Sequence, residues 1–499
     1  MNLGKMFDSF EKLMEGKFKI YRESAREKDG DIFFMVKDEK EKYLVILGDE
    51  KTCDEFDGNN AGELSIDGEK YRYKIAKKNH DNLKKLREKF PSLNPSRCGL
   101  KPSFGTGDRL GIATPAHIIA FEKYGKDLFP FLAQQSVRER MRTKRSWDDV
   151  LDDAVWGVFE RGYDGEFGAD ADHVKTLDEL EGALKVGYTM FTIDPSDYVR
   201  DPRQMKLEEK RRVYENLDGI KDIERMYLGR RYEISGESLI FDESNLVDIA
   251  LTYLDAINHV EKMFKFLKES KEEEFDFEVS VDETSAPTSP LAHIFIVEEL
   301  RRRNVEFTNL ALRFVGDWQK AIDYIGDLNL LDRELHLHGE IARKFGGYKL
   351  SLHSGSDKFS VYPLFYKNTE GLFHVKTAGT SYLEEIKVIA MKDPKLYREI
   401  HKFALTVFER DRASYHVTTD LSKIPNIDEL SDDELMNLFN DPNSRQLIHI
   451  TYGSVLNAKD EDGNYRFRDR IFRILFKNEE EHYHLLSEHI GKHLKLLKT

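Results

Sequence analysis

The sequence predicts an α/β protein built around a TIM (β/α)8-type barrel, and two observations support this fold. From about residue 98 to residue 380, eight short apolar segments alternate with helix-like stretches, and eight is the strand number of this barrel. Three of the segments end in clusters of His, Asp, Ser and Lys, as do strands that deliver catalytic side chains at the C-terminal end of a barrel. The segments are residues 101–105, 129–133, 168–172, 189–193, 275–279, 309–313, 349–353 and 373–376.

The first 97 residues predict an N-terminal α+β cap. Apolar runs at 32–36 and 43–47 alternate with charged turns, which is the pattern of a small sheet. A helix-like stretch from Asn79 to Phe90 is followed by a break at Pro91-Ser-Leu-Asn-Pro95. The chain therefore divides into a cap over 1–97, a catalytic barrel over 98–380 and a helical C-terminal extension over 381–499 that packs on the barrel.

About eighty residues separate the fourth barrel segment from the fifth, which predicts an insertion after strand 4 at about 200–245. It contains a possible hairpin over 231–240 and leads into a long amphipathic helix from Asn245 to Ser270. A loop after a barrel strand lies on the active-site face, so the insertion is either a lid or a surface decoration.

The composition excludes several classes of partner. Lys and Arg number 77 against 92 Asp and Glu, a formal charge of -15, so no basic surface collects nucleic acid or anionic membrane. There is no signal peptide pattern and no apolar run of 18 residues, and the two cysteines, Cys53 and Cys98, are expected to be ordinary thiols. We expect a soluble cytoplasmic enzyme with a small-molecule substrate; a homo-oligomer is compatible with the sequence.

Histidines in or after three predicted strands indicate a metal site. His173 follows Asp170 and Asp172, and an imidazole beside carboxylates suits a borderline divalent ion. His353 ends the seventh segment and His374 lies in the eighth, and barrel closure brings strand ends together. We expect either three histidine ligands, His173, His353 and His374, or two histidines with a carboxylate, binding Mn²⁺, Ni²⁺, Co²⁺ or Zn²⁺.

Carboxylates in the fifth segment predict acid and base groups. Alternation along the strand places Glu278 and Asp282 on the same side, and buried carboxylates are costly unless they meet a metal, a base or a substrate. Glu278 is expected to act as a general acid or base that faces Asp172 across the pocket. The alternative is structural ion pairing with Arg313 and Lys376.

Two loops and a lysine favour a small anionic substrate. Gly105-Thr-Gly-Asp-Arg-Leu-Gly111 departs from the dinucleotide pattern G-x-G-x-x-G, and its backbone amides suit an anionic substrate better. Ser354-Gly-Ser-Asp-Lys358 has a similar composition. Lys376 is either a Schiff-base lysine with a lowered pKa or a cation that binds a substrate carboxylate.

Longer motifs carry a family resemblance. They are Ser103-Phe-Gly-Thr-Gly-Asp-Arg-Leu-Gly111, Ala133-Gln-Gln-Ser-Val-Arg138, Gly168-Ala-Asp-Ala-Asp-His-Val-Lys175, Phe191-Thr-Ile-Asp-Pro-Ser-Asp197, Glu278-Val-Ser-Val-Asp-Glu-Thr284, Leu352-His-Ser-Gly-Ser-Asp-Lys-Phe-Ser-Val-Tyr-Pro363 and Phe373-His-Val-Lys-Thr-Ala-Gly-Thr-Ser-Tyr382. With them, nearly the whole chain resembles the bacterial tagaturonate/fructuronate epimerase family, although the first hundred residues and the insertion match more loosely.

The resemblance implies an isomerase of hexuronate catabolism, a metal-dependent epimerase that interconverts D-tagaturonate and D-fructuronate. It places the catalytic base on Asp172, a metal ligand on His173, the catalytic acid on Glu278 and a second metal ligand on His353, whereas His374 comes from the strand pattern alone. Candidates for substrate binding are Arg109, Gln134, Asp282, Arg313, Lys358 and Lys376, and the four cations among them are candidates for the substrate carboxylate.

The chemistry of this epimerisation favours a retro-aldol route. The inverted carbon is β to the ketone, so its C–H bond is not acidified and simple proton abstraction fails. Cleavage and re-formation of the carbon–carbon bond, with the metal as Lewis acid on the ketone, solves the problem. A redox route would need a nicotinamide site that the sequence does not show. The alternatives are a Schiff-base aldolase that uses Lys376 on a sugar acid or sugar phosphate, and a non-enzymatic sugar-binding protein.

Overall fold

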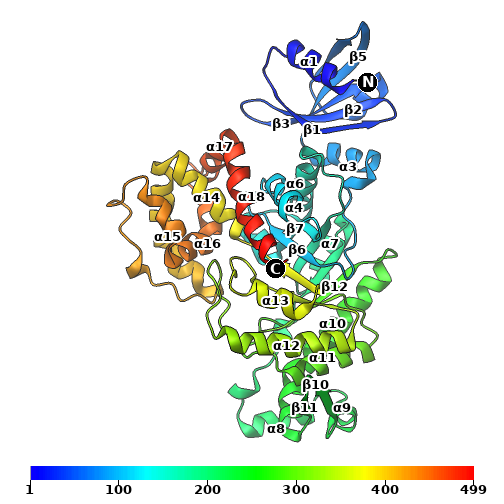
Figure 1. Ribbon diagram of the computed structural model, residues 1–499, viewed down its shortest axis with the longest axis vertical. Coiled ribbons are helices and arrows are strands. Elements are labelled where there is room, and N and C mark those ends of the chain that lie inside the picture. Colours follow the sequence, from blue (N-terminus) through cyan, green and yellow to red (C-terminus); the bar gives the residue numbers. More distant parts are fainter. Residues whose placement is uncertain (1, 499) are drawn as a thin grey trace.

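Eight parallel strands close into a barrel in the computed structural model, which describes residues 2–498 (Figure 1). Each strand lies at one of the predicted segments, so the predicted barrel is confirmed. All eight are almost wholly buried, because helices cover the outside of the barrel. The strands are β6 (Ser103–Gly107), β7 (Phe129–Ser136), β8 (Gly168–Val174), β9 (Met190–Ile193), β12 (Asp276–Ser280), β13 (Asn309–Ala311), β14 (Lys349–Leu352) and β15 (Phe373–Lys376).

The helices around the barrel begin with well-formed caps. In α7, for example, the Thr176 side chain accepts from the backbone N–H of Glu179, and the Glu179 carboxylate accepts from the backbone N–H of Thr176, which satisfies two otherwise free donors. The surrounding helices are α4 (Thr114–Tyr124), α5 (Val137–Thr143), α6 (Trp147–Glu160), α7 (Leu177–Val186), α10 (Glu243–Ser270), α11 (Pro290–Arg302), α12 (Leu328–Phe345) and α13 (Tyr362–Thr369).

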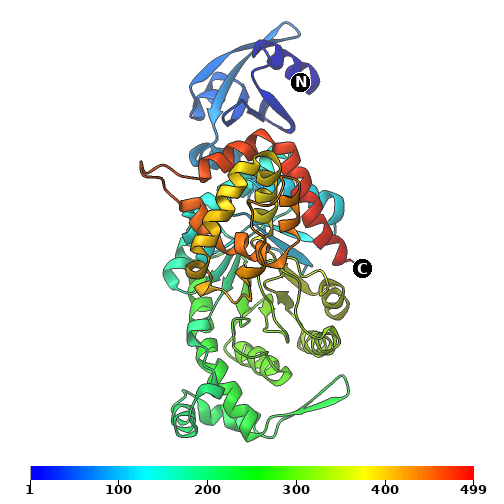
Figure 2. The same ribbon diagram turned by 90° about the vertical axis from the view of Figure 1, so that its left-hand side faces the viewer.

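The N-terminal cap is an antiparallel sheet with strand order β1-β2-β3-β5-β4. Its second strand in this order, β2, is continuously apolar over 32–36 because both faces are covered, one by α1 and the other by the main core beneath. Figures 1 and 2 show this cap at one end of an elongated molecule. Its elements are α1 (Leu3–Leu13), β1 (Lys19–Lys28), β2 (Asp31–Lys37), β3 (Lys42–Gly48), α2 (Glu50–Glu55), β4 (Asn60–Ile66), β5 (Glu69–Lys77) and α3 (His80–Lys89).

The insertion after the fourth barrel strand lies at the opposite end of the molecule from the cap (Figures 1 and 2). It packs on the outer helices, where Tyr227 O–H donates to Glu299 and Tyr232 O–H donates to Glu298. No residue of 200–245 lines the cavities at the strand ends, so this placement fits a surface decoration and not a lid. Its elements are α8 (Leu207–Glu215), α9 (Ile220–Tyr227), β10 (Arg231–Ile234) and β11 (Glu237–Ile240).

The C-terminal part is helical and lies beside the barrel (Figure 1). Helices α14–α17 surround a hydrophobic core of their own, while the last helix packs on α4 and joins the barrel core. No helix of residues 2–498 is both long and apolar enough to cross a membrane. The helices are α14 (Thr380–Lys392), α15 (Pro394–Asp411), α16 (Pro442–Asn457), α17 (Arg468–Lys477) and α18 (Glu479–Leu496).

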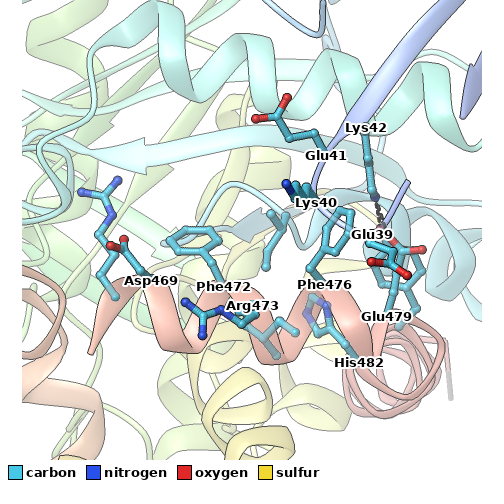
Figure 3. Close-up of a pocket in the computed structure, with 14 residues that line it drawn as sticks. Glu39, Lys40, Glu41, Lys42, Asp469, Phe472, Arg473, Phe476, Glu479 and His482 are labelled. Carbon is cyan, nitrogen blue, oxygen red and sulfur yellow. Dashed lines mark hydrogen bonds and ion pairs between the residues drawn. The ribbon is translucent and has the colours of Figure 1, made fainter. Parts of the chain in front are cut away.

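A cavity of about 870 Å³ separates the β2–β3 turn of the cap from α17 and α18 (Figure 3). A buried ion-pair cluster at its floor joins the cap to the body: Lys42 Nζ lies 2.7 Å from Glu160 and 2.5 Å from Glu479. Tyr21 O–H also donates to Glu479. Burial disfavours the charged form of Glu479, but Lys42 and Lys37 overcome this and lower its pKa to about 2.

Replacing Glu479 by glutamine is expected to lower the free energy of unfolding by about 3 kcal/mol, because it leaves the buried Lys42 without one of its carboxylates. The control is E480Q, since Glu480 is exposed and its pair with Lys19 should contribute little. A carboxylate with a lowered pKa stabilises the fold above its unfolded pKa, and this stabilisation disappears as pH falls through its folded pKa. Thermal unfolding at a series of pH values should therefore show the E479Q deficit at pH 7 and its loss between about pH 4.5 and 2; equal stability at pH 7 would contradict the assignment.

Candidate active site

Two adjoining cavities, of about 360 and 480 Å³, lie at the C-terminal ends of the barrel strands. They share part of their lining and form one continuous pocket, which is where barrel enzymes carry out their chemistry. The larger cavity beside the cap receives no side chain from these strand ends. The shared lining consists of Arg138, Asp172, His173, Glu283, Lys320, Ala378, Tyr415 and His449.

The end of β8 brings two neighbouring side chains into this pocket. Adjacent residues of a regular strand point to opposite faces, yet Asp172 and His173 both line the cavities. A bulge shifts the pairing of β8 with β9 between Ala171 and Val174, and His173 adopts a left-handed backbone conformation with φ of 57°. The bulge therefore redirects the strand so that a carboxylate and an imidazole act together.

Two histidines and a carboxylate form a group that fits a divalent metal ion. One ligand atom each from His173, Asp282 and His353 lies within 4.8 Å of the others, and the two imidazole rings are 5.0 Å apart. This is the two-histidine-plus-carboxylate alternative, with Asp282 in a position that the sequence suggested only for substrate binding. Nitrogen and oxygen donors of this kind suit Mn²⁺, Co²⁺, Ni²⁺ and Zn²⁺.

A buried carboxylate orients each histidine of the group. Asp172 Oδ1 lies 2.8 Å from His173 Nδ1, and Glu278 Oε1 lies 2.7 Å from His353 Nε2. Metal-binding histidines are commonly fixed by a carboxylate on the other ring nitrogen. Burial disfavours imidazolium, but Asp172 raises the pKa of His173 to about 9, and Asp282 and Glu278 raise that of His353 to about 10. The pocket thus has a negative potential that favours a bound cation.

Lys376, which lines the larger cavity, holds three carboxylates together. Its Nζ lies 2.6 Å from Asp170, 2.7 Å from Asp172 and 2.7 Å from Glu278. Burial favours the neutral amine, but the three carboxylates overcome this and raise the pKa of Lys376. Burial also favours the neutral form of Asp170 and raises its pKa to about 7, although the Lys376 ammonium opposes this. This arrangement keeps Lys376 a cation, which is the opposite of what a Schiff-base lysine requires.

The sequence suggested that Glu278 faces Asp172 across the pocket, but the structure does not place the two carboxylates in this way. Both contact the same Lys376 ammonium. Asp172 lines the pocket directly, whereas Glu278 is fully buried, with its Oε2 accepting from the Ser351 hydroxyl. Glu278 therefore does not line the pocket itself, but it contacts His353 and Lys376, which do.

The structure does not bring His374 into the metal-binding group. His374 is fully buried in the barrel interior, where its Nδ1 lies 2.9 Å from Ser103 Oγ and its ring packs on Phe131. It precedes Lys376 by two residues on β15, so it points to the same side of the strand but one layer deeper. Burial lowers its pKa, which keeps the imidazole neutral in the core.

Two of the other predicted substrate-binding cations are already paired. Arg109 donates to Glu139 at 2.8 Å and lies 3.7 Å from the Tyr452 ring centroid, although it borders the smaller cavity. Lys358 is fully buried and donates to three backbone carbonyls, and burial lowers its pKa to about 7.

Arg313 and Gln134 both line the larger cavity. Arg313 has no ion-pair partner within 4 Å among residues 2–498, so it remains available to an anion. Gln134 donates to the Thr377 carbonyl at 3.0 Å and presents an unpaired Oε1.

The first glycine-rich loop does not offer its amides to a substrate. The Asp108 carboxylate accepts from the backbone N–H groups of Leu110, Gly111 and Ala113, so these three amides are already hydrogen-bonded within the loop. Gly107 is required for a different reason: a Cβ there would lie 2.3 Å from the Ala378 carbonyl oxygen. The expectation that this loop cradles an anion is therefore wrong.

A second histidine cluster lies outside the pocket and is structural. Asp357 is close to His489 and His493, but its carboxylate already pairs with Arg445 at 2.8 Å. His493 Nε2 accepts from the Asp357 backbone N–H, so it is not free to bind a metal. The cluster fixes the loop after β14 on helix α18.

The sequence interpretation missed several pocket residues, among them Lys320, Tyr415 and His449. The first comes from the loop after β13, and the other two come from the C-terminal helical part. None follows a barrel strand directly, so the strand-end pattern gave no sign of them. His449 lies in helix α16, within the run 445–454 that the sequence alone did not mark as helical.

Comparison with known proteins gives consistent matches along the chain. A family model described as tagaturonate epimerase (UxaE) matches residues 21–497. The tagaturonate/fructuronate epimerase of Thermotoga maritima is 54% identical over 483 residues, which cover 96% of this chain and 97% of that protein. The native crystal structure of the fructuronate-tagaturonate epimerase from Cohnella laeviribosi has a TM-score of 0.92 at 40% identity, with 99% of both chains covered. A glycerol-complexed structure of the same protein gives 0.91.

Proposed function

Since this chain belongs to the tagaturonate epimerase family and is therefore an isomerase, we propose that it interconverts D-tagaturonate and D-fructuronate with the help of a divalent metal ion. The observation that carries the metal requirement is the group of His173, His353 and Asp282, whose donor atoms converge at the strand ends. The pocket is of a size that suits a six-carbon sugar acid.

The donor set fits an ion that polarises oxygen. His173 and His353 would supply one nitrogen each and Asp282 a carboxylate oxygen. When bound, the ion supplies Lewis-acid polarisation of the substrate ketone. Asp172 and Glu278 hold the two rings in the orientation that leaves the opposite nitrogens for the metal.

The two catalytic carboxylates manage the proton of the inverted hydroxyl. Asp172, which lines the pocket, accepts the O–H proton while the bond between the carbons α and β to the ketone breaks, and its electron pair moves toward the ketone. The aldehyde formed at the β carbon turns over, and the same bond re-forms on its other face. The new alkoxide then takes up a proton.

Lys376 delivers that proton and takes another from Asp172, while Glu278 holds the ammonium in place as a carboxylate. The Lys376 ammonium lies 2.7 Å from both Asp172 and Glu278, and together with His353 it keeps the pKa of Glu278 well below its usual range. Lys376 thereby also stabilises negative charge next to the reacting oxygen. The raised pKa that this role needs is unsuited to the Schiff-base aldolase alternative.

Removal of the metal is expected to reduce the rate of interconversion by about 10²-fold or more, because the Lewis acid lowers the activation barrier by several kcal/mol. The enzyme is stripped with a chelator and dialysed, and fructuronate formation from tagaturonate is followed by chromatography with and without added Mn²⁺, Ni²⁺, Co²⁺ or Zn²⁺. Restoration by metal in the wild type, but not in H353Q, supports the site. Full activity of protein shown by elemental analysis to be metal-free would contradict it.

A further inference from the structure

Lys320 is a cation of the pocket without a carboxylate partner among residues 2–498. Lys320 lines both adjoining cavities, and its ammonium donates a hydrogen bond to Ser354 Oγ at 2.8 Å. No carboxylate of residues 2–498 lies within 4 Å of it. Burial lowers the pKa of Lys320, and the nearby Glu283 only partly offsets this. An ammonium in this position is stabilised by an anion that enters the pocket.

Most other cations at the pocket are already committed. Arg109 pairs with Glu139, and Lys376 pairs with three carboxylates. Arg138 lies 3.5 Å from Glu283 and donates to the Ser414 carbonyl. Arg313 is also unpaired, but it lines only the larger cavity. Lys320 is therefore the free cation at the point where the two cavities meet.

The loop that carries Lys320 is fixed from several sides. Gln319 Oε1 accepts from the backbone N–H of Thr418 at 2.9 Å and from Gln446 Nε2 at 3.0 Å, so the C-terminal helices hold the loop. The buried Lys358 ammonium donates to the carbonyls of Gln319 and Ile322 at 2.7 and 2.6 Å. A cation held in this way binds an anion without first losing the freedom of a mobile loop.

We propose that Lys320 binds the substrate carboxylate and makes the enzyme select a sugar acid over the corresponding neutral sugar. The inference rests on the proposed epimerase function and names the group that recognises its substrate. Ser354, which accepts from Lys320, directly follows His353, so Lys320 lies beside the proposed metal ligands. One six-carbon substrate can therefore place its ketone near His353 and its carboxylate on Lys320. The carboxylate-bearing fragment then stays anchored while its aldehyde turns over.

The test compares tagaturonate with its uncharged uronamide in wild type, K320M, K320R, R313M and the control K367M. Lys367 lies on the outer helix α13 and pairs with Asp332. The value of kcat/KM is measured for each sugar, or the inhibition constant of the amide where its turnover is too slow. We expect K320M to lower kcat/KM for the uronate about 10- to 100-fold, with K320R restoring most of it, because one charge-assisted hydrogen bond is lost. The constants for the amide should stay within about threefold of the wild type.

The comparison separates this inference from the proposed function. A wild type that does not interconvert tagaturonate and fructuronate defeats the proposed function itself. A wild type that does, combined with an unchanged uronate preference in K320M, overturns the role of Lys320. An equal loss for both sugars would show a structural role, and loss of the preference in R313M but not in K320M would transfer the role to Arg313.

Discussion

Replacing Asp172 by asparagine is expected to lower kcat by about 10²- to 10⁴-fold, because asparagine cannot accept the hydroxyl proton. Asp172 is the member of the carboxylate cluster that lines the pocket, and it contacts both His173 and Lys376. The measurement is single-turnover conversion of tagaturonate with the metal content checked in parallel. The matched control is D197N, since Asp197 lies on the neighbouring loop and pairs with Lys175 at the surface.

The metal content distinguishes two ways in which this variant can lose activity. If D172N binds metal normally and converts slowly, Asp172 acts on the proton. If the variant loses its metal and regains activity at high metal concentration, Asp172 acts chiefly by orienting His173. Activity within threefold of the wild type would contradict both roles.

Replacing Lys376 by methionine is expected to abolish detectable activity and to lower the free energy of unfolding by about 3–5 kcal/mol. The reason is that Asp170, Asp172 and Glu278 would be left buried without their shared cation. Thermal and denaturant unfolding measure the stability. Lowering the pH should reduce the difference in unfolding free energy between K376M and the wild type, since protonated carboxylates are neutral and do not need the ammonium.

A second variant keeps the test sharp if the methionine protein does not fold. K376R retains the positive charge but cannot form a Schiff base, so it should recover much of the stability. Borohydride added during turnover should leave the wild-type mass unchanged. A reduced adduct on Lys376 would instead support the aldolase alternative and overturn the assignment of Lys376 as an ammonium in the resting enzyme.

The barrel could be predicted from the sequence because parallel strands buried on both faces are short apolar runs, and their polar ends mark the catalytic face. The same pattern identified Asp172, His173, His353 and Lys376 as pocket residues. The pattern gives the direction of a side chain but not its depth in the barrel. For this reason His374 was wrongly expected to be a metal ligand. That residue points inward like Lys376, yet it lies a layer below the pocket.

Residues outside the strand ends could not be predicted in this way. Lys320 reaches the pocket because Thr418 and Gln446, which are 99 and 127 residues beyond Gln319, fix its loop. Lys358 lies in a loop with the composition of an anion-binding site, but two of its three carbonyl partners, Gln319 and Ile322, come from a distant segment. Such placements depend on contacts between distant segments, which no periodicity records.

The division of the pocket wall between two hydrophobic cores has a practical consequence for changing the sugar that the enzyme accepts. The strand ends that carry the reacting groups belong to the barrel core, whereas Tyr415 and His449 come from the separately packed helical part. Libraries aimed at new substrates can therefore vary the helical wall while the catalytic groups keep their support. The shape of this wall therefore becomes adjustable independently of the chemistry.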